Sequence, residues 1–141
     1  MKRTIALVTT LVIVQLVVPI WTFAAQREDV KRILKRLEDD TDKFTKSLDN
    51  ALDHSALNGT RAEDEINGYV HAFEEATDHL KDKYSDTGAA PNLAREVLSR
   101  GRTIDGFMRR NRLGGKAESD WQIVRSDLNL LARVYRIQWR W

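Results

Sequence analysis

The sequence contains no cysteine, and that absence removes several classes of protein at once. No disulfide, thiol nucleophile or thiolate metal site can form, and a lipid anchor attached to an N-terminal cysteine is excluded. The chain also lacks a G-x-S-x-G elbow, a P-loop, an H-E-x-x-H pair and the dinucleotide-binding glycine pattern. These absences favour a protein that is not an enzyme, uses no cofactor and is held together by its hydrophobic core alone.

Carboxylates placed for general acid–base catalysis are missing as well. Three acidic pairs are adjacent in sequence, at Asp39-Asp40, Asp64-Glu65 and Glu74-Glu75. Neighbouring residues of a helix point about 100 degrees apart, so the members of such a pair do not converge on one substrate. We therefore predict no catalytic residue in this chain.

The first 25 residues predict an export signal. Lys2 and Arg3 form a positive start, an apolar run follows from Ile5 to Ile20, and small residues end the segment near Ala24. This order is typical of a cleaved secretory signal peptide, here over residues 1–25. The run is also close to the shortest membrane-spanning length, so an uncleaved N-terminal anchor is the alternative. Either way the predicted location is exported, periplasmic or extracellular.

Residues 26–141 are long enough for a single domain, and their charge is divided between two halves. The formal net charge of +2 comes from Lys2 and Arg3 alone. Residues 26–90 hold 10 basic against 16 acidic residues, whereas residues 91–141 hold 11 against 5. One interpretation is that the arginines of the second half pair with the acidic first half. The other is that they form a basic surface for an anionic partner.

Apolar residues at alternating steps of three and four predict amphipathic helices. A stripe from Trp121 to Tyr135 repeats one that lies 55 positions earlier. The earlier stripe consists of Ile66, Tyr69, Phe73, Ala76 and Leu80, and the later one of Trp121, Val124, Leu128, Leu131 and Tyr135. Because a helix with one apolar stripe needs helical partners, the pattern predicts a bundle.

The expected helices cover about residues 27–52, about 61–83, a segment that begins at Pro91, and about 117–135. Thr60 and Glu63 fit a capping box at the start of the second helix. Gly101 interrupts the stripe of the third helix, where we expect a kink or a break. The repeated hairpin predicts an all-α fold, an up-down four-helix bundle built from two helical hairpins.

The last residues change period. Tyr135, Ile137, Trp139 and Trp141 alternate with polar residues, which predicts a short extended aromatic tail rather than more helix. We expect this tail to fold back and cover an open part of the bundle. The alternative is an anchor that places its tryptophans in a lipid interface.

Arginines gather at the end of the third expected helix and return in the tail. Arginine beside an aromatic residue can bind phosphate groups. In an exported protein, an anionic lipid or polysaccharide of the cell envelope is the expected target, and nucleic acid is not. The candidate contacts to a partner or membrane are Arg109, Arg110, Arg112, Arg136, Trp139, Arg140 and Trp141.

His71, Glu75 and His79 are spaced four residues apart on one side of the second expected helix. That spacing allows an exposed divalent metal site, so weak metal binding is a further alternative. The trio faces away from the apolar stripe and lacks the Glu-x-x-His spacing of di-iron bundles. A solvated helix face is the simpler interpretation, and we predict no metal site.

The segment Asp120–Asn129, followed by Leu131-Ala132, Tyr135 and a Trp-x-Trp end, resembles a group of bacterial proteins. Together with Arg109–Leu113, it is similar to uncharacterised small exported helical proteins of environmental bacteria, which have no assigned function. The resemblance implies an exported helical protein and carries over no catalytic or binding residue.

Three functional hypotheses follow from these patterns. The first is an exported helical bundle that serves as a non-catalytic interaction or structural module, with an unknown protein partner or with itself as a homodimer. The second is a peripheral protein that binds the cell envelope or anionic lipid through its Arg/Trp-rich C-terminal half. The third is weak metal binding through His71, Glu75 and His79.

Overall fold

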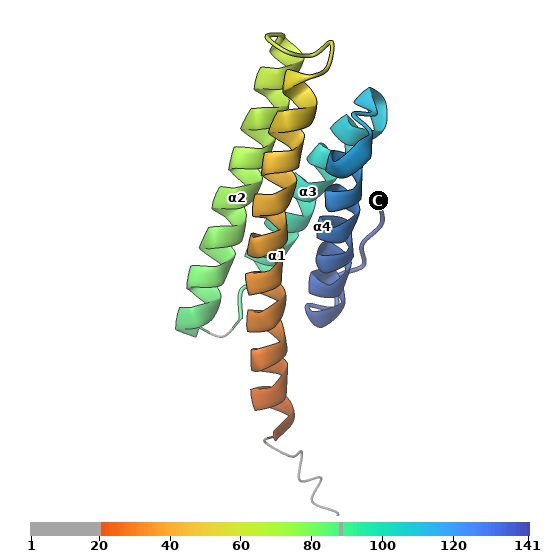
Figure 1. Ribbon diagram of the computed structural model, residues 1–141. Helices are drawn as coiled ribbons and strands as arrows, with labels where there is room; N and C mark the ends of the chain where they lie inside the picture. Colours follow the sequence, from red (N-terminus) through yellow and green to blue (C-terminus); the bar gives the residue numbers. More distant parts are fainter. Residues whose placement is uncertain (1–20, 88) are drawn as a thin grey trace, which may run out of the picture.

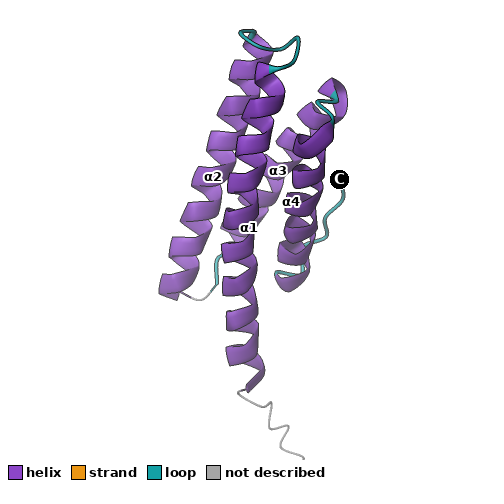
Figure 2. Cartoon of the chain, viewed as in Figure 1, coloured by secondary structure: helices purple, strands orange, loops and turns teal. Residues whose placement is uncertain are grey.

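The computed structural model describes residues 21–87 and 89–141. These residues form four α-helices: α1 (Trp21–Asp53), α2 (Arg61–Thr87), α3 (Pro91–Asn111) and α4 (Gly115–Val134). No strand occurs within the described ranges (Figure 2). The predicted all-α class is therefore confirmed. Within the same ranges, no helix has both the length and the apolar character that crossing a membrane requires.

The predicted signal peptide lies largely outside the described residues. Only its last five residues, 21–25, are described, and they belong to the start of α1. The first helix therefore begins earlier than the predicted position near Arg27. Cleavage of the segment and its alternative, retention as an anchor, both stay predictions.

The helices form an up-down bundle of two hairpins. The α1–α2 and α3–α4 loops lie at the same end of the molecule, and the α2–α3 connection lies at the other end (Figure 1). Packing across the hairpins is more extensive than packing within them, because α1 packs mainly on α4 and α2 mainly on α3. The predicted four-helix bundle is thus confirmed, with its two hairpins packed side against side.

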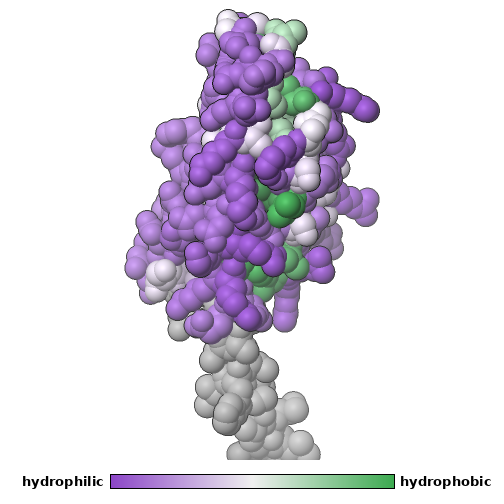
Figure 3. All heavy atoms as spheres, in the orientation of Figure 1, coloured by the Kyte–Doolittle hydropathy of each residue, from purple (hydrophilic) through white to green (hydrophobic). Residues whose placement is uncertain are grey.

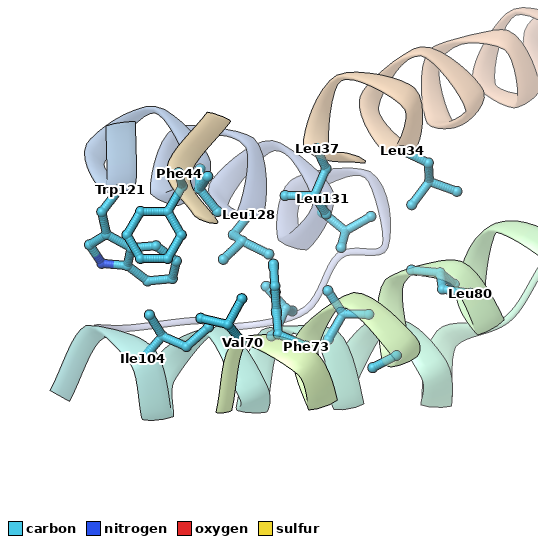
Figure 4. Packing of buried hydrophobic residues seen from close by; sticks show 14 of the residues in the cluster. Leu34, Leu37, Phe44, Val70, Phe73, Leu80, Ile104, Trp121, Leu128 and Leu131 are labelled. Atoms are coloured by element: carbon cyan, nitrogen blue, oxygen red, sulfur yellow. The ribbon is translucent and has the colours of Figure 1, made fainter. Parts of the chain in front are cut away.

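The predicted apolar stripes supply the core. Phe73 of α2 and Trp121, Leu128 and Leu131 of α4 are at most 1% exposed. Phe44 of α1 meets Trp121 with ring centroids 5.0 Å apart (Figure 4). Burial of each such large apolar side chain stabilises a fold by about 1.5–3 kcal/mol, so these stripes account for much of the bundle's stability.

Helix α3 runs without interruption from Pro91 to Asn111, so the break predicted near Gly101 is not present. Gly101 is instead a point of close packing. A Cβ atom added there would lie 2.6 Å from Cδ1 of Leu128, and 3.6 Å from Cε2 of Phe73. The missing side chain lets α3 approach its neighbours. The packing at this contact offsets the lower helix propensity of glycine.

The repeat continues at the starts of α2 and α4. The Gly59 N–H donates to Oε2 of Glu63 at 2.5 Å, and the Gly114 N–H donates to Oε1 of Glu118 at 3.1 Å. Gly59 and Gly114 have nearly the same left-handed φ, 71° and 72°. The capping box predicted at Thr60 is wrong. The Thr60 hydroxyl donates to the Leu57 carbonyl, and Glu63 accepts from the Gly59 N–H and not from the Thr60 N–H, which itself donates to the Leu57 carbonyl at 2.9 Å.

The outer surface is mainly hydrophilic, with small apolar areas between polar side chains (Figure 3). Among residues 28–86 and 89–141, Ile123 is the one large hydrophobic residue whose side chain is well exposed, at 46%. Charge rather than apolar area therefore distinguishes the faces of this bundle.

Candidate anion-binding surface

The chain reverses direction directly after α4. Arg136 has a left-handed φ of 53°. The Ile137 N–H donates to the Ala132 carbonyl at 2.8 Å, and the Arg136 N–H donates to the Arg133 carbonyl at 3.0 Å. These two bonds form a Schellman motif, a helix ending that favours glycine at the left-handed position. The turn sends residues 137–141 back alongside the bundle (Figure 1).

The tail keeps the two-residue alternation seen in the sequence. Its apolar residues are partly buried against the core, and its polar residues point outward. The inward set is Tyr135, Ile137, Trp139 and Trp141, and the exposed set is Arg136, Gln138 and Arg140. The prediction that the tail folds back over the bundle is confirmed.

Arginines from both helices of the second hairpin hold the tail. The guanidinium of Arg102 on α3 lies 4.3 Å from the ring centre of Trp139. It also donates a hydrogen bond to the Arg140 carbonyl. The guanidinium of Arg125 on α4 lies 4.6 Å from the ring centre of Trp141. Cation–π contacts of this kind each contribute about 0.5–2 kcal/mol, so the tail bridges α3 and α4.

Trp141 is fixed by three further contacts. Its indole N–H donates to Oδ1 of Asn129 at 2.9 Å. Its ring packs edge-on against Trp121 and Trp139, with centroids 6.4 Å and 5.3 Å away. Both tail tryptophans are therefore engaged in packing, and insertion of their rings into lipid would first require the tail to detach.

Next to Trp141, α3 and α4 enclose an open cleft of about 300 Å³. Trp121 and Arg125, which both contact Trp141, are also part of its wall. Arg109 and Arg112 line the cleft from the end of α3. The carboxylates of Asp105 and Glu118 lie in the same wall.

Asp105 is a buried carboxylate that contacts three of the residues lining the cleft. It is 3% exposed and accepts a hydrogen bond from the Trp121 indole N–H at 3.1 Å. Its Oδ2 lies 2.7 Å from Nη2 of Arg109, and its Oδ1 lies 3.2 Å from Nε of Arg125. A buried carboxylate between two guanidinium groups fixes both of them, and removal of one partner of such a pair typically destabilises a fold by about 3–5 kcal/mol.

The structure brings together most of the predicted contact residues. Arg109 and Arg112 share the cleft, and the tail places Trp139, Arg140 and Trp141 directly beside it. Arg136 is at the turn that starts the tail. Arg110 is exposed and does not line the cleft, and its Nη1 would lie 3.3 Å from a Cβ at Gly106.

The sequence prediction missed Asp105 and Arg125 as parts of this site. The signal available for Asp105 was its position four residues before Arg109, an acid-first pair on one helix face. Arg125 likewise lies four residues after Trp121. These two pairs meet only because α3 and α4 lie side by side. Sequence patterns within a single helix do not predict that placement.

The carboxylates of the second half are mostly withdrawn from the surface. Of its five acidic residues, Asp105, Asp120 and Asp127 are buried. Among the ion pairs of the described residues, none joins an arginine of residues 91–141 to a carboxylate of residues 26–90. The predicted direct pairing of the basic half with the acidic half is therefore wrong.

One ion pair does join the two halves. In it, an arginine of the acidic first half pairs with a carboxylate of the basic second half. Arg36 of α1 donates to Oδ1 of Asp127 on α4 at 2.7 Å. Burial raises the pKa of Asp127, nearby Asp40 adds to the rise, and Arg36 opposes it. Burial would also raise the pKa of Asp120, but hydrogen bonds from Lys116 and Ser47 hold it below its ordinary value. The two buried aspartates thus interact with Arg36 and Ser47 of α1 and with Lys116 in the first turn of α4.

The consequence is an excess of exposed arginines. Seven of them are exposed and form no ion pair within the described ranges: Arg95, Arg102, Arg110, Arg112, Arg133, Arg136 and Arg140. Several of these lie along α3, the tail and the cleft. We call this region the α3–tail surface. It is defined by Arg102, Arg112, Arg136 and Arg140, which are unpaired within the described ranges, together with Arg109 and Arg125, which pair with Asp105 in the cleft.

The histidine trio does not form a metal centre. His71 and Glu75 lie 3.7 Å apart with both side chains more than 70% exposed. Within the described part of the chain, no group of three His, Asp or Glu residues is arranged to hold a metal ion. The exposed helix face that the sequence also allowed is what these residues form.

Searches against family models, curated proteins and solved structures found no match to this chain. The resemblance to small exported helical proteins of bacteria therefore stays a prediction. The geometry and charge of the α3–tail surface are therefore the features that bear on function.

Proposed function

We propose that this protein is an exported, non-catalytic interaction module that binds an anionic partner through the α3–tail surface. The observation that carries the proposal is the set of exposed arginines left without ion pairs in the second half of the chain. Unbalanced charge of one sign attracts an oppositely charged surface and accelerates association with it. Export is supported by the Lys2/Arg3 start and the apolar run Ile5–Ile20.

The proposal has two forms. In the first, the partner is a protein or a second copy of the chain. Self-association has an electrostatic basis, because the second half is basic and the first half is acidic. A cleft between α1 and α2 is lined by the carboxylates of Glu38, Asp42, Glu74 and Asp78. Sedimentation at low and high salt tests this form, since a charge-driven dimer dissociates as salt rises.

The second form is peripheral binding to an anionic envelope surface. The packed tail supports a version in which arginines contact the surface and the tryptophans hold the tail. Each arginine near an anionic membrane surface contributes about 1 kcal/mol, and this contribution is screened by salt.

Binding of the protein to isolated cell envelopes tests the proposal for any partner that lies in the envelope, whether protein or lipid. The variant R112E/R136E/R140E reverses three exposed charges of the α3–tail surface, and we expect it to lose about 100-fold in affinity. The matched control K31E/K35E/K46E reverses three exposed charges of α1. Equal loss in the two variants, or no loss in either, would count against the α3–tail surface as the binding face.

A further inference from the structure

The cleft between α3 and α4 has features of a specific ligand-binding site, and not only of a surface with excess positive charge. Its three arginines come from separate positions: Arg109 from the last turn of α3, Arg112 from the residue that caps α3, and Arg125 from the middle of α4. Arg112 holds a left-handed φ of 40°, a conformation uncommon for a residue with a side chain. The chain therefore places a guanidinium at this rim despite an unfavourable backbone geometry.

Two of the three guanidinium groups are oriented before any ligand arrives. Asp105 contacts Arg109 through one oxygen and Arg125 through the other. Arg125 also donates from Nη1 to Oε1 of Gln122 at 3.2 Å, and its ring contact with Trp141 fixes the plane of the group. A guanidinium carries five N–H donors, so both arginines keep donors for a further acceptor after these contacts.

The three guanidinium groups differ in how far they are already engaged. Nε of Arg125 is buried and lies 3.2 Å from Oδ1 of Asp105, so this nitrogen is not available to a ligand. Arg112 is exposed and makes no ion pair among the described residues. The other carboxylate of the wall, Glu118, accepts the Gly114 N–H and is already engaged. Arg112 is therefore the lining arginine with the most donors left for an anionic ligand.

The shape and charge of the cleft select the class of anion. Three arginines and two carboxylates line it, which gives a formal net charge of +1 and matches a monoanion. Guanidinium groups pair with phosphate as well as with carboxylate. The four oxygens of a phosphodiester, two of which share its charge, point in more directions than the two coplanar oxygens of a carboxylate, which suits arginines placed at three separate positions. We propose that the cleft binds the phosphodiester group of a soluble molecule or of a lipid headgroup. This inference deepens the proposed function and rests on it.

Calorimetric titration of the full-length protein tests the site with defined probes. The soluble arm uses glycerophosphoglycerol, which is phosphatidylglycerol without its acyl chains, with acetate as the planar comparison. The lipid arm uses vesicles of phosphatidylglycerol. R112Q removes one lining guanidinium at an exposed position, and R95Q is the matched control on the same helix, outside the cleft. Far-ultraviolet circular dichroism verifies that both variants stay folded.

We expect one glycerophosphoglycerol to bind per chain, about tenfold more weakly in R112Q and with little change in R95Q. Vesicle binding that depends on Arg112 without soluble binding would assign the site to lipid-borne phosphodiester. Acetate binding as tight as glycerophosphoglycerol would overturn the ligand class. Equal weakening of vesicle binding in R112Q and R95Q would overturn the site while leaving the proposed function intact. Absence of binding to every probe would contradict this inference and the membrane-binding form of the proposed function, and would leave the form with a protein partner to the sedimentation test.

Discussion

At the scale of single residues, one glycine decides how closely the helices of the second half approach their neighbours. Gly101 is fully enclosed in α3, and a methyl group there would overlap Leu128, which is itself 0% exposed. Gly68 in α2 is the natural comparison, because nothing lies within 4 Å of a Cβ added to it. The same change at the two positions thus separates helix propensity from packing.

We expect G68A to stabilise the protein by up to about 1 kcal/mol, because alanine is the better helix former. G101A gains the same propensity but forces Leu128 from its packed position, and overpacking of a core destabilises by about 1–3 kcal/mol. G101A should therefore be less stable than G68A in urea unfolding. Equal stability of the two variants would show that the approach of α3 does not depend on Gly101.

Two buried aspartates of α4 should respond to pH in opposite directions. The pKa of Asp127 is raised mainly by burial, so its contribution to stability is present at low pH and is lost as the pH rises through that raised value. The pKa of Asp120 is lowered by its hydrogen bonds, so its contribution is present above its ordinary pKa and is lost as the pH falls.

Urea unfolding of D127N and D120N at several pH values checks this pair. The stability advantage of wild type over D127N should shrink as the pH rises from acidic to neutral. The advantage over D120N should shrink as the pH is lowered. Changes in the same direction for both variants would contradict the assigned pKa directions.

At the scale of elements, the C-terminal tail behaves as a strap across α3 and α4. Trp141 contributes a hydrogen bond, an aromatic contact and a cation–π contact that join the tail to α4, and a second aromatic contact, with Trp139, within the tail. The Schellman turn at Arg136 aims the tail into this position. The strap therefore depends on one turn residue and on its terminal aromatic side chains.

Truncation of Trp141 to alanine should destabilise the protein by about 1–3 kcal/mol, because these contacts are lost together. Q138A changes an exposed tail residue and should leave stability within about 0.5 kcal/mol of wild type. Thermal unfolding of both variants measures the difference. No effect from W141A would mean that the tail is not held against the bundle in solution.

The variant R136G tests how much the left-handed conformation at Arg136 costs in stability. Glycine accepts a left-handed φ without steric strain, whereas other residues lose about 1–2 kcal/mol there. We therefore expect R136G to be more stable than wild type by about 1 kcal/mol, and to bind anionic surfaces more weakly because one arginine is gone. A loss of stability in urea unfolding would indicate that the Arg136 side chain contributes to the fold.

Sequence patterns predicted the helices, the stripes and the inward-facing tail because each depends on neighbours within one or two turns. Trp121 and Phe73 are buried as their spacing required. The role of Gly101 could not be predicted, because glycine is favoured both by a helix break and by a close helix contact, and only Leu128, 27 residues away, distinguishes them. Asp105 and Arg125 depend on the same long-range placement of α3 beside α4.

At the scale of the whole molecule, charge is separated between two halves that pack as one bundle. The acidic residues of the first half remain largely exposed, whereas the second half buries three of its five carboxylates and exposes its arginines. The charge separation in the sequence thus becomes more pronounced on the folded surface. A basic face of this kind is available to any anionic surface at low salt, and screening should weaken the contact.

Vesicle flotation tests this account most directly. The sample is residues 26–141, which retain every described core residue because the core begins at Val30. Wild type and R112E/R136E/R140E are compared on anionic and neutral vesicles, at low and high salt. We expect flotation with anionic vesicles only, lost at high salt and lost in the variant. Absence of flotation at low salt, or flotation that neither salt nor the three reversals weaken, would contradict it.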